Sequence, residues 1–147
     1  AITDTLAIIV PIAIGLWRIG NYINQELPWF TPYNGPFAIV KNGVSYFPSP
    51  LLEMLLEGGL LFIIMLYFGT RLEFFNGKKS SKMYRGGLLS SIFLIWYSVM
   101  RIMAEQFRLP DGHIGYLLGT EWLTLGIVYT LPFFVTGISI MLIQKRN

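Results

Sequence analysis

The chain has 147 residues, of which 54% are hydrophobic, 16% aromatic and only 13% charged, and its net charge is +3. Soluble domains carry about 25% charged residues, so this composition argues against a surface covered by water and predicts one membrane domain over residues 1–147. The sequence has no cysteine and one histidine, which excludes disulfides and thiolate metal sites and argues against any metal site.

The first apolar segment, about residues 3–24, is long enough to cross a bilayer, which needs about 20 residues. No basic region precedes it and no convincing cleavage site follows it, so we do not interpret it as a signal peptide. The chain does not begin with methionine, which leaves a processed chain and part of a longer chain as alternatives. The segment ends in an unexpectedly polar stretch, RIGNYINQEL, at residues 18–27.

The next segment, residues 28–50, holds five of the eight prolines and is predicted to be a loop. Within it, FAIVKNGVSYF has two short runs of strand-forming residues on either side of Asn42 and Gly43. An Asn-Gly pair between such runs is a signal for a two-residue turn, so we expect a short β-hairpin in this loop.

Three further apolar segments follow, at about residues 51–70, 86–107 and 121–143. The fold class predicted is therefore an all-α integral membrane protein with four transmembrane helices. Seven of the eleven basic residues fall in the loop after the second span and in the tail: Arg71, Lys78, Lys79, Lys82, Arg85, Lys145 and Arg146. The positive-inside rule places these segments, and with them both termini, in the cytoplasm. The flanking spans argue against a nucleic-acid partner for the basic run.

Charged residues inside three of the spans lie at a common depth. With a helical rise of about 1.5 Å per residue, Arg18, Glu57 and Arg101 each lie about 21 to 22 Å from the inner end of their span. Glu53 lies about one turn further out. Since the hydrocarbon core is about 30 Å thick, all four residues are expected in its outer third, where they can build one shared site.

Helical spacing supports a shared site. Arg101, Glu105 and Arg108 follow one another at i, i+4 and i+7, and Glu53 and Glu57 are also four residues apart. Lipid penalises such charges by several kcal/mol, so they are expected to face the bundle interior or a wet cleft. The alternative is structural, since arginines near a helix end can reach the headgroups and a Glu–Arg pair can simply join two helices.

The residue types themselves favour an anionic ligand. Arginine binds phosphate through two parallel hydrogen bonds, so a cationic cleft at the outer headgroup level suits an anionic phospholipid. Glu105 or Glu26 can orient the arginines or accept a proton. His113 lies in an outer loop, where a solvated histidine is more common than a general base.

Three stretches resemble the bacterial prolipoprotein diacylglyceryl transferase family. RIGNYINQEL is similar to the family signature Gly-Arg-x-Gly-Asn-(Phe/Tyr)-Ile-Asn-x-Glu, and YSVMRIMAEQFRLPD is similar to its second Arg-x-x-x-Glu segment. PSPLLEMLLEG is similar to the Pro-Ser-Gln-Leu-Tyr-Glu motif. The resemblance runs in the same order from about residue 10 to the end and covers the C-terminal half of the family pattern.

The resemblance implies a membrane enzyme of the bacterial plasma membrane. Such an enzyme transfers diacylglycerol from phosphatidylglycerol to the lipobox cysteine thiol of a preprolipoprotein signal peptide, without a cofactor, and glycerol 1-phosphate leaves. Its phosphate-binding residues correspond to Arg18 and Arg101, and we add Arg108 from the same helical face. Asn21, Glu26 and Glu105 correspond to catalytic positions: Asn21 orients lipid or backbone, and the two glutamates fix the arginines.

Several positions depart from the family pattern and leave a second hypothesis open. Trp17 replaces a glycine, Phe47 replaces a histidine, Leu52 replaces a tyrosine, and residues 27–30 lack the usual glycine and arginine. These departures favour a non-catalytic homologue that serves as a lipid-binding or scaffolding subunit beside other membrane subunits. A transporter is less favoured, because the charges gather at one depth instead of crossing the bilayer.

Overall fold

Four helical stretches form the body of the protein in its computed structural model, which describes residues 2–26, 33–76, 85–106, 119 and 123–146. Each stretch is long and apolar enough to cross a membrane, which confirms the predicted all-α membrane fold. Their bounds are α1 Ile2–Ile23, a second stretch made of α2 Ser49–Glu53, η1 Met54–Leu60 and α3 Leu61–Arg71, then α4 Leu88–Glu105 and α5 Leu125–Arg146. The predicted residues Arg108 and His113 lie outside the described residues.

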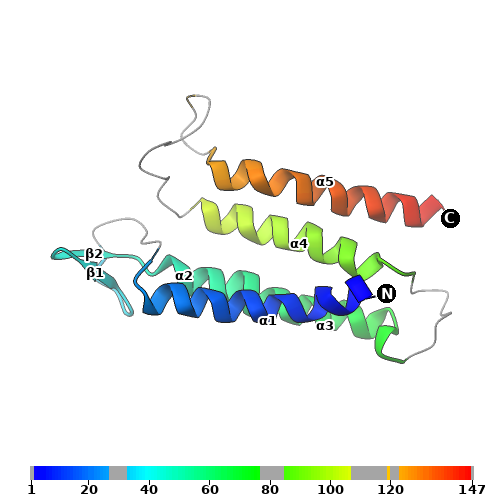
Figure 1. Cartoon of the computed structure of the whole chain (residues 1–147), viewed down its shortest axis with the longest axis horizontal. Helices are drawn as coiled ribbons and strands as arrows, with labels where there is room; N and C mark the ends of the chain where they lie inside the picture. Colours follow the sequence, from blue (N-terminus) through cyan, green and yellow to red (C-terminus); the bar gives the residue numbers. More distant parts are fainter. Residues whose placement is uncertain (1, 27–32, 77–84, 107–118, 120–122, 147) are drawn as a thin grey trace.

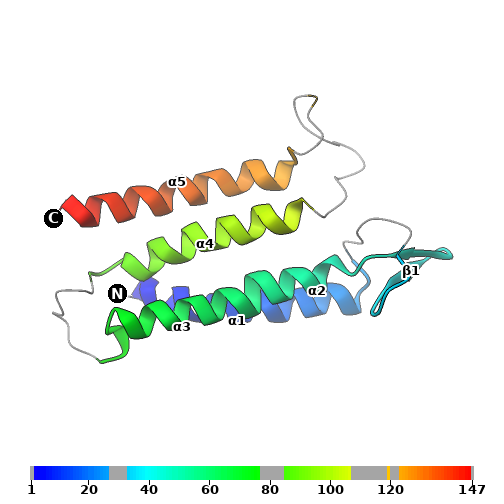
Figure 2. The same cartoon turned by 180° about the vertical axis from the view of Figure 1, so that it is seen from behind.

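The helices run side by side, with α4 between α5 and the pair formed by α1 and the second stretch (Figures 1 and 2). Both termini lie at one end of the bundle, which we call the terminal end. A small two-stranded sheet lies at the opposite end, which we call the hairpin end. A single-turn 3₁₀ helix, η2 Phe74–Asn76, follows α3.

The sheet is the predicted hairpin. Strand β1 Ile39–Lys41 pairs antiparallel with β2 Val44–Tyr46, with Ile39 opposite Tyr46. Asn42 and Gly43 between the strands have φ values of 52° and 76°, which are typical of the two-residue turn that an Asn-Gly pair favours. Ile39 is buried and anchors the hairpin to the rest of the molecule.

The second helical stretch differs from the regular helix that we expected. Its middle segment, η1, is a π-helix, which is rare and in most proteins is limited to single turns, often at functional sites. Glu53 is the last residue before this segment and Glu57 lies within it. The widened backbone therefore sits at the two carboxylates of this stretch.

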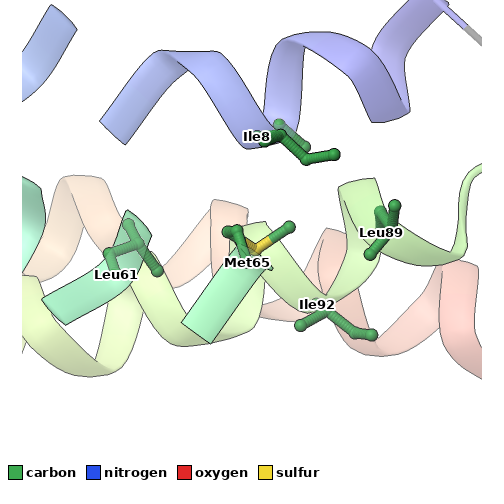
Figure 3. Packing of buried hydrophobic residues seen from close by; sticks show 6 residues of the cluster. Ile8, Leu61, Met65, Leu89 and Ile92 are labelled. Carbon is green, nitrogen blue, oxygen red and sulfur yellow. The ribbon is translucent and has the colours of Figure 1, made fainter. Parts of the chain in front are cut away.

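A buried apolar cluster joins α1, α3 and α4 toward the terminal end (Figure 3). Ile8 of α1 faces Leu61 and Met65 of α3, with Leu89 and Ile92 of α4 beside them. Lipid is as apolar as these side chains, so close packing, not removal of apolar surface from water, holds the helices together here.

A buried carboxylate fixes the start of α4 against α1. Asp4 accepts hydrogen bonds from the backbone N–H of Gly87 (2.7 Å) and from the N–H and hydroxyl of Ser90 (both 2.9 Å). Backbone N–H groups at a helix start have no partner within the helix, and a carboxylate there is favoured by the helix dipole. Asp4 therefore caps α4 from a neighbouring helix.

Helix α5 packs mainly on α4, and Gly137 of α5 allows a close approach. A Cβ atom on Gly137 would lie 2.9 to 3.0 Å from atoms of Ser91, Leu94 and Ile95 on α4. Near the terminal end, the Gln144 side chain donates to the carbonyl of Gly86 at 2.8 Å. These contacts set the register of α5 along α4.

Candidate functional site

Five charged side chains from three helical stretches meet toward the hairpin end of the bundle, and we call them the ionic cluster. Arg18 comes from α1, Glu53 and Glu57 from α2 and η1, and Arg101 and Glu105 from α4. All five lie in stretches suited to crossing a membrane, so the charges need partners within the protein or from a polar ligand.

Arg18 binds both carboxylates of the second stretch. Its Nη1 lies 2.7 Å from Oε2 of Glu53, and its Nη2 lies 3.2 Å from Oε2 of Glu57. The guanidinium group thus bridges two acids that are four residues apart in the sequence.

Arg101 reaches the same two carboxylates from the opposite helix. Its Nη1 lies 3.4 Å from Oε1 of Glu53 and 3.2 Å from Oε1 of Glu57. Its Nη2 lies 3.1 Å from Oε2 of Glu105, one turn along the same helix. Arg18 and Arg101 therefore share two partners, and their side chains converge on one site.

Burial divides the cluster into a rim and a base. The side chains of Arg18 and Arg101 are each 12% exposed, whereas those of Glu53 and Glu57 are 1% and 0% exposed. Glu105 is 6% exposed. The cations are therefore the more accessible groups, and the carboxylates lie behind them.

The cluster has two positive and three negative groups, so its net charge is −1 when all five are ionised. Each guanidinium carries five N–H donors, and the ion pairs of Arg18 occupy its two terminal nitrogens. The Nε of Arg18 is buried and has no hydrogen-bond partner among the described residues. Donor capacity therefore remains for another acceptor.

Two glycines allow the close contact of α1 and η1 that brings Arg18 to the glutamates. A Cβ atom on Gly58 would lie 2.7 Å from the Cα of Gly15 and 3.4 Å from the carbonyl oxygen of Pro11. Any side chain at Gly58 would push α1 away from η1, and with it Arg18 away from Glu57.

The carboxylate of Glu105 is held from α5 as well as from α4. The Thr124 hydroxyl donates to Oε1 of Glu105 at 3.1 Å. A Cβ atom on Gly126 would lie 2.6 to 2.9 Å from the same carboxylate, so glycine leaves the space that this group fills. The start of α5 therefore positions the third acid of the cluster.

The other predicted site residues lie at the edge of the cluster or beyond it. Asn21 is buried and lies one turn from Arg18 toward the hairpin end. Glu26 is exposed, lies beyond the end of α1, and its backbone N–H donates to the carbonyl of Asn21. The structure thus brings together Arg18, Arg101 and Glu105, but it does not bring the side chain of Glu26 into the ionic cluster.

The sequence places Glu53 and Glu57 in the shared site by depth and spacing, but it assigns no catalytic or binding role to these two acids. The same depth and spacing could have identified them as the shared partners of the arginines. Thr124 and Gly126 carry no such signal, because their role depends on how α5 packs on α4.

The fold and the cluster define a class: a polytopic helical membrane protein with a buried ionic site toward one end of its spans. Residues 1–143 match the family described as prolipoprotein diacylglyceryl transferase, and the chain belongs to this family.

Curated relatives agree with the family match. The chain is similar to the phosphatidylglycerol–prolipoprotein diacylglyceryl transferase of Chromohalobacter salexigens, with 35% identity over 99% of this chain and 51% of the relative. It is 40% identical to the enzyme of the same name from Mesorhizobium japonicum, over 97% of this chain and 48% of the relative. The chain thus spans about half the length of the curated relatives that it matches.

Proposed function

We propose that this protein binds phosphatidylglycerol through Arg18 and Arg101 and takes part in the transfer of its diacylglyceryl group to a preprolipoprotein. The observation that carries this proposal is the convergence of the two arginines from α1 and α4 on one site, with the cations at the accessible rim. A rim of guanidinium groups suits an anionic phosphodiester, because arginine matches phosphate oxygens in shape and charge.

The glutamates at the base support this role by orienting the arginines. A guanidinium group held by carboxylates on one side has its planar fork fixed, which reduces the entropy lost when its remaining N–H groups bind a ligand. The phosphate approaches from the exposed side and adds hydrogen bonds to those that the carboxylates already make. We assign to Asn21, which is buried one turn further toward the hairpin end, the role of orienting the glycerol or ester oxygens.

The transfer step requires charge stabilisation more than a nucleophile from this chain. The lipobox cysteine loses its proton, its sulfur forms a bond to the terminal glycerol carbon of the diacylglyceryl group, and the bond from that carbon to the phosphate oxygen breaks. Glycerol 1-phosphate leaves with the electron pair. Arg18 and Arg101 stabilise the negative charge on this leaving group. Glu105 is the acid of the cluster that we propose as the proton acceptor, since it is the most exposed of the three.

A second candidate function is a non-catalytic lipid-binding or scaffolding subunit. It is favoured by the length of the match, about half of each relative, and by the apolar side chains that remain open on the outer faces of α1 and α5. Leu16, Trp17, Tyr129 and Val135 are each at least 60% exposed and are available to other membrane subunits.

We further propose that the protein lies in the bacterial plasma membrane with both termini in the cytoplasm. The described basic residues Arg71, Arg85 and Lys145 all lie at the terminal end, and the positive-inside rule places that end inside. The ionic cluster then faces the outer leaflet.

Transfer of labelled diacylglycerol from phosphatidylglycerol to a lipobox peptide by the purified protein tests the enzymatic proposal. We expect thioether-linked product with the native protein and at least a hundredfold less with Arg101→Lys, which keeps the charge but loses the planar fork. Retention of phosphatidylglycerol without any product selects the binding role instead. Failure of both transfer and retention contradicts the proposed function.

A further inference from the structure

Ser49 is a buried polar residue outside the ionic cluster. It is the first residue of α2 and is 1% exposed. Its hydroxyl has no hydrogen-bond partner within the part of the chain that the structure describes. A buried hydroxyl without a partner is costly, and native proteins almost always supply one. Something outside these residues is therefore expected to meet Ser49.

The position of Ser49 links it to the ionic cluster. Ser49 and Glu53 are four residues apart in α2, so they lie on one face of the helix with Ser49 one turn nearer the hairpin end. Helix α2 packs against both α1 and α4, and Glu53 is 2.7 Å from Arg18. Ser49 thus lies on the hairpin side of Glu53, one turn from a carboxylate of the cluster.

A second unpartnered donor belongs to the same site. The Nε of Arg18 is also buried and without a hydrogen-bond partner among the described residues. Both terminal nitrogens of Arg18 are engaged by Glu53 and Glu57, so Nε is the donor that remains buried and unused. Both unpartnered donors belong to residues beside Glu53, because Ser49 lies one turn from Glu53 and Arg18 is paired with it.

We propose that Ser49 and the Nε of Arg18 donate hydrogen bonds to a phosphate oxygen of the bound anionic phospholipid. This inference rests on the proposed function and adds a residue to its phosphate site. The chemistry fits the residues, because both groups are hydrogen-bond donors and a phosphate oxygen is an acceptor. Ser49 is therefore a positioning and binding residue for the headgroup.

The test compares thermal unfolding of the purified protein with three additives: phosphatidylglycerol, diacylglycerol with the same acyl chains, and inorganic phosphate. In Ser49→Ala we expect the lipid-free Tm to be unchanged or higher, because the substitution removes a buried hydroxyl that lacks a partner. The extra stabilisation by phosphatidylglycerol over diacylglycerol is expected to fall by an amount equivalent to about a tenfold loss of affinity.

The matched control is Ser91→Ala. Ser91 is also fully buried, but its hydroxyl donates to the carbonyl of Leu88 at 2.7 Å, so it has a partner within its own helix. Ser91→Ala should leave the difference between phosphatidylglycerol and diacylglycerol as it is in the native protein.

The outcomes separate this inference from the proposed function. If the native protein prefers phosphatidylglycerol and Ser49→Ala prefers it equally, the inference is wrong and the proposed function stands. A lower lipid-free Tm in Ser49→Ala makes the hydroxyl structural and also overturns the inference. No preference in the native protein overturns both. If inorganic phosphate raises the Tm of the native protein and Ser49→Ala abolishes this rise, Ser49 contacts a phosphate. That result overturns the lipid as the source of the phosphate.

Discussion

At the scale of single residues, the ionic cluster is unusual because its acids outnumber its bases. Arg101 takes part in three of its five ion pairs and Arg18 in the other two. Removal of an arginine therefore leaves a net charge of −2 among buried groups, whereas neutralising one glutamate leaves a net charge of zero. The two kinds of substitution should therefore lower the free energy of unfolding by different amounts.

We predict that Arg101→Ala destabilises the protein by about 3 to 5 kcal/mol, because it leaves buried carboxylates without a cation. Glu57→Gln should cost less, about 1 to 2 kcal/mol, since both arginines keep Glu53 and the cluster becomes neutral. Unfolding in detergent, followed by circular dichroism, measures both changes.

Arg71→Ala is the control for the loss of an arginine. Arg71 is exposed and lies outside the cluster. Its Cζ atom is 5.5 Å from the centroid of the Tyr67 ring. Its removal should change stability by no more than about 0.5 kcal/mol. If Glu57→Gln lowers the free energy of unfolding more than Arg101→Ala does, the net negative charge of the cluster does not control its stability.

At the scale of elements, the contact between α1 and η1 positions the cluster. The π-helical segment carries Glu57, and the next residue, Gly58, meets Gly15 of α1 almost backbone to backbone. The geometry of the ion pairs of Arg18 therefore depends on how closely these two elements approach.

We predict that Gly58→Ala destabilises the protein by about 1 to 3 kcal/mol, because its Cβ would overlap the backbone of Gly15 and separate the two elements. Gly59→Ala is the matched control, since nothing lies within 4 Å of a Cβ at that position. Thermal unfolding of both variants tests this contact, and equal effects would contradict it.

A second prediction at this scale concerns the cap on α4. Asp4→Ala removes the acceptor for Gly87 and Ser90 and should cost about 1 to 2 kcal/mol. Thr5→Ala, at the exposed neighbouring position, should change stability by less than about 0.5 kcal/mol. Hydrogen exchange at the first turn of α4 gives a local reading: faster exchange is expected in Asp4→Ala, and unchanged protection would show that the cap contributes little.

The elements that the sequence predicted well are those governed by local pattern. Apolar length predicted the four spans, and Asn42–Gly43 predicted the hairpin, because bilayer thickness and turn geometry act on short segments. The π-helix could not be predicted, since π-helices are rare and apolar length does not distinguish them from α-helices. The same holds for Thr124, which meets Glu105 only because α5 packs on α4.

At the scale of the whole molecule, the two ends of the bundle differ in charge. The ionic cluster lies toward the hairpin end, and the described exposed basic residues of the loop and tail lie at the terminal end. The proposed orientation in the membrane follows from this asymmetry, and it decides which leaflet the cluster can draw lipid from.

Because the chain has no cysteine, single introduced cysteines give a clean test of orientation. We predict that a membrane-impermeant maleimide labels Val44→Cys, in the hairpin, in intact spheroplasts. Lys145→Cys should be labelled only after the membrane is broken. Both positions are exposed, so access through the membrane is the variable that the experiment measures. The reverse pattern would place the cluster at the cytoplasmic leaflet.

A distance measurement between phosphate and guanidinium groups tests whether the ionic cluster binds the lipid headgroup. Protein labelled with ¹⁵N-arginine is reconstituted with phosphatidylglycerol, and ³¹P–¹⁵N dipolar couplings are recorded by solid-state NMR. We predict couplings from the lipid phosphate to two arginines, one lost in Arg18→Lys and the other in Arg101→Lys. Couplings that persist in both variants, or that are absent from the native protein, would contradict the assignment of the ionic cluster as the headgroup site.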